Sequence, residues 1–197
     1  MTTIGLVRHG ITDWNIQGIA QGSSDIPLNK TGRQQAASLA NRLASEEDWD
    51  LIISSDLSRA KETAEIIGRK LQLPVSHFDT RLRERSGGKI EGTTERERLE
   101  KWGSDWRKLD LAMENLDIAT ERGLSCLEDV LENFKGQRVL LVSHGALIGL
   151  TLQKLLPEKF KETSMDNTSI TILKNAESQW ACSLYNCTVH LAKSESY

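Results

Sequence analysis

Two histidines in this chain stand in the same local setting: each follows a short apolar run and is followed at once by glycine. Arg8 and His9 come after residues 4–7, and His144 comes after residues 139–142 and a serine. Apolar runs of this length, ended by polar residues and Gly, predict buried strands. Open α/β sheets bind their ligands at the carboxyl ends of such strands. An imidazole placed there can act as a nucleophile, and an arginine beside it can bind an anion.

Two further ionisable residues could join this site. Arg59 falls in the first turn of a helix that we expect Ser55 or Asp56 to cap. There the guanidinium and the helix N-terminus would both favour an anion. Glu84 stands in a loop rich in arginine. Taken alone, Arg59 could equally be an exposed helix residue and Glu84 a surface carboxylate.

These motifs belong to a longer pattern. The chain carries Arg-His-Gly-x-Thr-x-Trp-Asn at 8–15 and Ser-Ser-Asp-Leu-x-Arg-Ala-x-Glu-Thr-Ala at 54–64. Leu-x-Glu and then Glu-Gly follow within 82–92, and the second His-Gly stands at 144–145. In this order the segments resemble those of the histidine phosphatase superfamily, which includes the cofactor-dependent phosphoglycerate mutases. The resemblance covers nearly the whole chain.

The resemblance implies a role for each residue of the pattern. His9 would be the residue that becomes phosphorylated, Glu84 the proton donor, and His144 the second histidine at the phosphate. The loop at 10–29 is rich in Gly and Ser, whose free N–H groups could cradle an oxyanion. The phosphate-binding residues would be Arg8, Asn15, Gln21, Gly22, Arg59, His144 and Gly145.

The chemistry of a phosphate monoester explains why these residue types are needed. The dianion repels nucleophiles, so a site must first neutralise its oxygens, and two arginines could do so through their planar forks. The same cations would disfavour a proton on His9, which must be neutral to attack. A backbone carbonyl accepting from its Nδ1 would leave Nε2 free as the nucleophile. Glu84 would protonate the leaving oxygen and later take a proton from water. This scheme needs no metal and no cofactor.

Composition limits the alternatives. The chain has 197 residues, a net charge of −3 and a pI of about 5.9. One domain over residues 1–197 accounts for this length, and the charge argues against a broad nucleic-acid-binding surface. No run of 18 apolar residues predicts a membrane span, and no leader segment is apparent, so we expect a cytoplasmic protein acting on a small molecule. The sequence gives no oligomeric state.

Cys126, Cys182 and Cys187 are expected to be reduced structural thiols, although the last two could pair in an oxidising compartment.

Alternating strands and helices predict the fold class α/β, with a three-layer α/β/α sandwich around a mainly parallel mixed sheet, as the resemblance to phosphoglycerate mutase-like proteins also implies. Residues 85–125 are expected to form a small lid or substrate wall, with two or three short helices within 93–122. We expect Thr31 to cap a helix over 32–45, and other helices to cover 121–134 and 146–156. We expect His190 at the surface and a frayed tail at 193–197.

Two alternatives to a phosphatase remain open at this stage. The first is a cofactor-dependent phosphoglycerate mutase, which must retain its phosphohistidine while the bound intermediate reorients. The short 93–122 segment argues against it, as does Leu124, where family members often carry glutamate. The second is a regulatory module that binds phosphorylated ligands without turning them over, and the presence of Glu84 argues against that.

Overall fold

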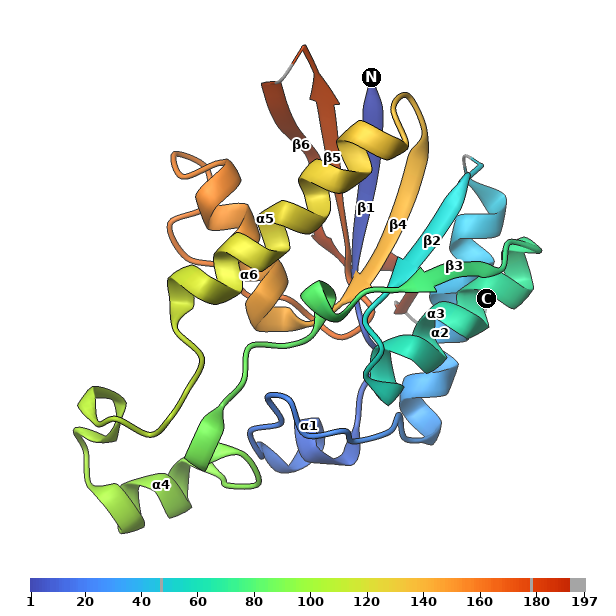
Figure 1. Cartoon of the computed structure of the whole chain (residues 1–197). Helices are drawn as coiled ribbons and strands as arrows, with labels where there is room; N and C mark the ends of the chain where they lie inside the picture. The colour runs from blue at the N-terminus through green and yellow to red at the C-terminus, as the bar shows by residue number, and fades with distance from the viewer. Residues whose placement is uncertain (47, 178, 192–197) are drawn as a thin grey trace.

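A six-stranded mixed sheet forms the centre of the computed structural model, which describes residues 1–46, 48–177 and 179–191 (Figure 1). The strand order is β3-β2-β4-β1-β5-β6. Strands β1 to β4 are mutually parallel, whereas β5 and β6 pair antiparallel. The predicted α/β class and mainly parallel sheet are therefore confirmed. The strands are β1 Thr2–Arg8, β2 Leu51–Ser54, β3 Val75–Phe78, β4 Arg138–Ser143, β5 Ile170–Ala176 and β6 Gln179–Cys187.

Helices cover both faces of this sheet, which makes three layers (Figure 1). Helices α2 and α3 bury Leu39, Leu43 and Ile67 against one face, and α5 and α6 bury Leu127 and Leu152 against the other. None of the helices in the described ranges is long and apolar enough to cross a membrane. The helices are α1 Asp13–Gln17, α2 Lys30–Ser45, α3 Ser58–Leu71, α4 Glu95–Trp102, α5 Leu116–Asn133 and α6 Gly145–Leu155. Single 3₁₀ turns span Thr80–Leu82, Gly88–Ile90, Trp106–Lys108 and Val189–Leu191.

The strand order brings the ends of β1, β4 and β2 together at one edge of the sheet. β4 lies between β1 and β2, and Arg8 at the end of β1 pairs with Ser143 at the end of β4. The backbone N–H of His9 continues this ladder by donating to the Ser143 carbonyl at 3.0 Å. Any side chain that follows these three strands must therefore lie at a shared edge.

One segment leaves the body of the molecule. Residues 92–115, here called the arm, carry α4 and one 3₁₀ turn and extend away from the sheet (green to yellow-green in Figure 1). Trp106 is 5% exposed, donates through Nε1 to Glu95, and is flanked by the guanidinium groups of Arg98 and Arg107. The prediction of short helices here is correct, and Trp106 packs within the arm itself.

Several local predictions are wrong for identifiable reasons. Asn29, not Thr31, caps α2, because its side chain accepts from the Gly32 N–H at 2.9 Å. Helix α3 starts after Leu57, which makes no side-chain cap, so neither Ser55 nor Asp56 is the capping residue. Asp56 instead pairs with Arg83.

The C-terminal half also departs from expectation. Helix α5 begins at Leu116 rather than near 121, because Asn115 caps it by accepting from two backbone N–H groups. His190 is half-buried, with Nε2 at 3.2 Å from the Thr168 hydroxyl, and burial lowers its pKa to about 4. All three cysteines are free thiols. The tail predicted at 193–197 lies outside the described residues.

Candidate active site

His9 follows β1 and is 2% exposed. Its Nδ1 lies 2.7 Å from the carbonyl oxygen of Gly10. Because a carbonyl can only accept, Nδ1 carries the proton and Nε2 keeps its lone pair. Burial, reinforced by the charges of Arg59 and Arg8, lowers the pKa of His9 well below its usual range. The imidazole is therefore neutral near pH 7, as a nucleophile must be.

His144 follows β4, and its ring centroid lies 5.1 Å from that of His9. Its Nε2 is 2.9 Å from the hydroxyl of Ser55, which itself accepts from the Leu57 N–H at 3.3 Å. The Ser55 hydroxyl keeps its own hydrogen to donate to Nε2, and with that bond the proton of a neutral His144 is on Nδ1. Burial and the charge of Arg59 lower the pKa of His144 well below its usual range. In that tautomer His144 can donate from Nδ1 as a neutral imidazole.

Arg59 is fully buried in the first turn of α3. Its two terminal nitrogens donate to the carbonyls of Ser24 at 2.7 Å and Gly22 at 2.8 Å. Burial lowers the pKa of Arg59 to about 10, with Glu84 and Asp25 acting against that effect. The expected planar fork is thus already engaged by backbone, and the group is held in one orientation.

Arg8 is oriented in the same manner, because its Nη1 donates to the carbonyl of Met165. Three buried nitrogens then lie around His9 without a hydrogen-bond partner among the described residues: Arg8 Nε, Arg59 Nε and His144 Nδ1. Buried N–H groups in proteins almost always have partners. Arg8 and Arg59 both act electrostatically on His9, and the His144 ring lies beside it, so an oxyanion bound at His9 could supply the missing acceptors.

Glu84 lies at the N-terminus of α6. Its carboxylate accepts from the backbone N–H of Arg85 at 2.9 Å. It also accepts from the backbone N–H groups of Ala146 and Leu147, at 3.1 Å each. The N-cap residue of α6, His144, supplies no side-chain cap, so Glu84 takes that place. Glu84 also acts electrostatically on Arg8 and Arg59, which places its charge beside the strand-end residues.

The remaining predicted residues surround this centre. Asn15 Oδ1 accepts from Thr12 at 3.1 Å and from the Asn167 amide at 3.3 Å, and the same Asn167 nitrogen donates to the His9 carbonyl at 3.1 Å. Gln21 accepts the Thr12 hydroxyl at 2.9 Å. Asn15 and Gln21 therefore order the loop next to His9 in this structure. Gly22 supplies a carbonyl to Arg59, and Gly145 packs against the Arg8 side chain.

A cavity of about 400 Å³ opens beside Arg8, Glu84 and Gly145. Leu116 and Leu150 give it apolar walls. Its polar wall consists of Arg85, Gln153, Thr163 and Ser164. The cavity therefore borders residues at or just after the ends of β1 and β4.

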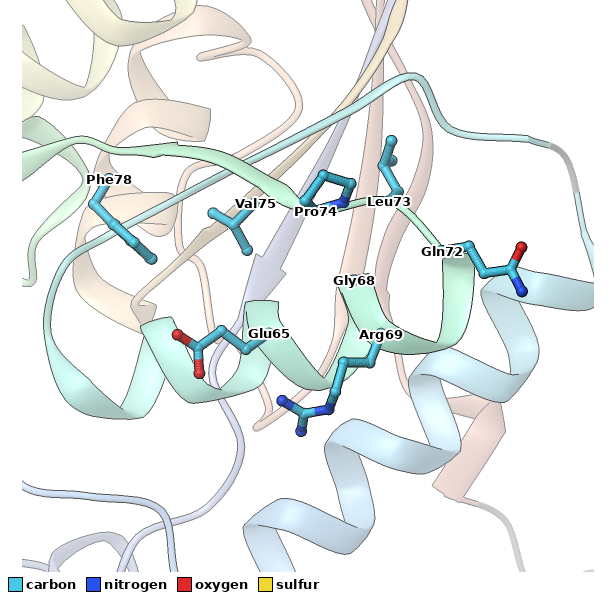
Figure 2. A pocket seen from close by; sticks show the side chains of 8 residues that line it. All are labelled: Glu65, Gly68, Arg69, Gln72, Leu73, Pro74, Val75 and Phe78. Atoms are coloured by element: carbon cyan, nitrogen blue, oxygen red, sulfur yellow. The ribbon is translucent and has the colours of Figure 1, made fainter.

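A larger cavity of about 470 Å³ lies between α3 and β3 (Figure 2). Its charged lining residues are Glu65 and Arg69, and Leu73, Val75 and Phe78 supply apolar surface. It contains none of the residues that the sequence singled out for chemistry. Within the described ranges, no group of three or more His, Cys, Asp or Glu side chains could hold a metal ion.

Sequence reasoning missed several residues that hold the site. Ser55 contacts His144, and Thr63 accepts from the Gly10 N–H at 3.1 Å. Asn167 binds the His9 carbonyl, and Glu91 binds several donors of the 23–24 loop. Ser55 had a usable signal, since it directly follows a strand as the two histidines do, and Thr63 and Glu91 stand in the quoted motifs without any sign of their partners.

Comparison with known proteins agrees with this geometry. Residues 4–188 match the family model of the histidine phosphatase superfamily (branch 1). The chain is 37% identical over 195 residues to the uncharacterized phosphatase PhoE of Bacillus subtilis, covering 98% of each chain. It is 37% identical to a probable phosphoglycerate mutase, GpmB, of Salmonella arizonae, covering 93% of this chain and 89% of the relative.

Solved structures give the same result. A mutant phosphoserine phosphatase from Entamoeba histolytica, in complex with phosphoserine, superposes with a TM-score of 0.80 at 29% identity. The match covers 97% of this chain and 100% of that one. The chain therefore belongs to branch 1 of the histidine phosphatase superfamily, and its general activity is that of a phosphatase.

Proposed function

We propose that the protein is a metal-independent phosphatase that hydrolyses small phosphate monoesters through a phosphohistidine on His9, with Glu84 as the proton donor. The three unpartnered buried donors around a neutral imidazole carry this proposal: Arg8 Nε, Arg59 Nε and His144 Nδ1. The donors would neutralise the equatorial oxygens of the phosphoryl group, and the lone pair on Nε2 of His9 would face phosphorus.

The reaction proceeds in two balanced steps. In the first, Nε2 of His9 forms a bond to phosphorus while the bond from phosphorus to the leaving oxygen breaks. The leaving oxygen takes the electron pair and a proton from Glu84, and the alcohol departs. In the second, Glu84 removes a proton from water, the water oxygen bonds to phosphorus, and the N–P bond breaks. Orthophosphate leaves and His9 regains its lone pair.

The cavity next to Glu84 supports a small substrate. Leu116 and Leu150 would contact apolar parts of the leaving group, and Arg85 and Gln153 its polar parts. Residues from 85 onward, together with the start of α5, would then serve as the substrate wall. The similarity to the phosphoserine phosphatase of Entamoeba histolytica supports small phosphorylated molecules as the substrate class.

The decisive experiment is hydrolysis of 4-nitrophenyl phosphate with excess chelator, by the wild type and by His9→Ala. We expect the wild-type rate to survive the chelator and kcat of the variant to fall by about 10⁴-fold or more, as loss of a covalent nucleophile does. Alkaline denaturing quench followed by peptide mass spectrometry should place a phosphoryl group on His9. Phosphate on another histidine, or activity lost to the chelator, would overturn the proposal.

A phosphoglycerate mutase is the second candidate, because the chain is similar over most of its length to a relative carrying that name. Leu124 lies on α5 and is not among the residues that line the cavity, so it supplies no contact there. Isomerisation of phosphoglycerate that depends on a bisphosphoglycerate primer, and that outpaces hydrolysis, would favour the mutase. Hydrolysis without isomerisation would favour the phosphatase.

A further inference from the structure

Glu91 is the most heavily hydrogen-bonded carboxylate near the site, and no step of the proposed reaction uses it. One oxygen accepts from the Ser23 N–H at 2.8 Å, the Ser23 hydroxyl at 2.9 Å and the Gly87 N–H at 2.8 Å. The other accepts from the Ser24 N–H at 3.0 Å and the Ser24 hydroxyl at 2.6 Å. Such a carboxylate joins two chain segments rather than facing solvent.

The first segment holds Arg59. The carbonyls of Gly22 and Ser24 accept from the two terminal nitrogens of that arginine. Gly22 has a φ of +49°, and a Cβ on it would stand 2.2 Å from Glu91 Oε1. The carboxylate therefore lies directly against the backbone that orients Arg59, and only glycine permits the approach.

The second segment is the acid loop, residues 84–91, which carries Glu84. Glu91 closes this loop on itself through the Gly87 N–H. On its other side the loop is tied to α5, because Glu114 accepts from the Ser86 N–H at 3.0 Å and pairs with Arg122 at 2.8 Å. Glu91 is thus the carboxylate that connects the proton donor's loop to the phosphate side of the site.

The charge state of Glu91 fits this position. Burial raises its pKa, but the hydrogen bonds from Ser24, Ser23 and Gly87 outweigh that effect and hold the pKa below its usual range. The group is an anion at neutral pH, with donors on both oxygens. An amide at this position would keep one acceptor and turn an N–H₂ group toward the donors of Ser24.

We propose that Glu91 is a positioning residue whose carboxylate fixes the acid loop against the loop that holds Arg59, so that Glu84 reaches the oxygen leaving the phosphoryl group. The inference rests on the proposed function, because it takes Glu84 as proton donor and Arg59 as phosphate ligand. Its consequence is specific: without Glu91, proton delivery suffers more than phosphate binding.

The test uses two substrates of the same ring size whose leaving groups differ in acidity. Phenyl phosphate needs a proton on its leaving oxygen far more than 4-nitrophenyl phosphate does. For Glu91→Gln we expect kcat/KM on phenyl phosphate, which reports only the steps up to departure of the alcohol, to fall about 10- to 100-fold, as small misplacements of a catalytic group do. We expect the ratio of kcat/KM for 4-nitrophenyl phosphate to kcat/KM for phenyl phosphate to rise about tenfold.

Two variants frame this result. Glu84→Gln should raise the ratio at least as much. Asp50→Asn should leave the ratio unchanged and is the matched control. The Asp50 carboxylate also accepts a backbone N–H, that of Arg138, at 2.7 Å. It lies where β2 and β4 begin, at the opposite end of these strands from the site. Backbone bonds between Ala20 and residues 92–93 should keep Glu91→Gln folded. If it does not fold, the double variant Ser23→Ala and Ser24→Ala removes two donors and gives the same comparison.

The outcomes are distinguishable. An unchanged ratio in Glu91→Gln, with a raised ratio in Glu84→Gln, would make Glu91 a structural anchor and overturn the inference alone. An unchanged ratio in Glu84→Gln would remove the proton donor from the proposed function and the inference with it. A raised ratio in both variants supports the positioning role.

Discussion

The candidate active site and the arm differ in how they hold their charged side chains. Arg8, His9, Arg59 and His144 lie where the sheet is fully covered, and His9 and Arg59 are only 2% and 0% exposed. The arm is held by exposed ion pairs such as Arg107 with Glu95 and by one buried tryptophan, Trp106. The first region keeps the Arg59 guanidinium out of water, whereas most ion pairs of the arm are exposed.

This difference shows that the free-energy cost of desolvating charged groups is concentrated at the candidate active site. Removing a guanidinium from water is expensive, and the lowered pKa of Arg59 reports that cost. The strand-end donors are therefore set before a phosphate arrives and need not reorganise. The arm carries no comparable cost, because most of its ion pairs are exposed to water.

The largest effect should follow from removing Arg59, the buried donor in the first turn of α3. Arg59→Gln should lower kcat/KM for 4-nitrophenyl phosphate by about 10²–10³-fold, as loss of one preorganised donor does at other oxyanion sites. Steady-state kinetics with the folded variant measures this loss. Arg33→Gln, which breaks an exposed pair with Glu62 between α2 and α3, is the matched control and should leave kcat/KM unchanged. A loss of less than about threefold for Arg59→Gln would contradict the comparison.

The buried histidines should make stability depend on pH. Burial lowers the folded-state pKa of His9, His144 and His190 below that of an unfolded histidine, about 6.5. Below that pH the unfolded chain takes up protons that the folded protein does not, so the free energy of unfolding falls as pH falls. Each histidine should contribute a slope of up to about 1.4 kcal/mol per pH unit.

Urea unfolding in phosphate-free buffer from about pH 7.5 to about pH 5 measures this slope. His144→Asn should reduce the slope by the contribution of one histidine, because asparagine does not titrate in this pH range. An acid slope identical in the variant would show that His144 takes up its proton in the folded protein.

The same contrast explains what the sequence could predict. Arg8, His9 and His144 were predictable because each follows a buried apolar run, and parallel strands bring their carboxyl ends together. Thr31 and Asn29 are both residue types that cap helices, and only the three-dimensional structure shows that Asn29 is the cap of α2. The role of Glu91 depends on a loop 68 residues earlier in the chain, and no local pattern carries that contact. The start of α5 was missed because the pattern gave Asn115 no emphasis over its polar neighbours.

The smallest effect on global stability should come from the arm. Replacing a buried tryptophan with alanine costs about 3–5 kcal/mol when the side chain belongs to the main core. Trp106 instead contacts Glu95, Arg98 and Arg107, all within the arm. We expect Trp106→Ala to change the free energy of global unfolding by less than about 1 kcal/mol, because the arm can open before the body unfolds.

Hydrogen exchange separates the two regions in one experiment. In Trp106→Ala, amides of residues 95–108 should lose protection while those of β4 keep theirs. Leu141→Ala, in the centre of β4 and fully buried, is the matched control and should lower the global free energy of unfolding by about 2–5 kcal/mol. If Trp106→Ala cost as much as Leu141→Ala, the arm would share the cooperative core of the sheet. The contrast between a costly, preset phosphate site and an independent arm would then no longer hold.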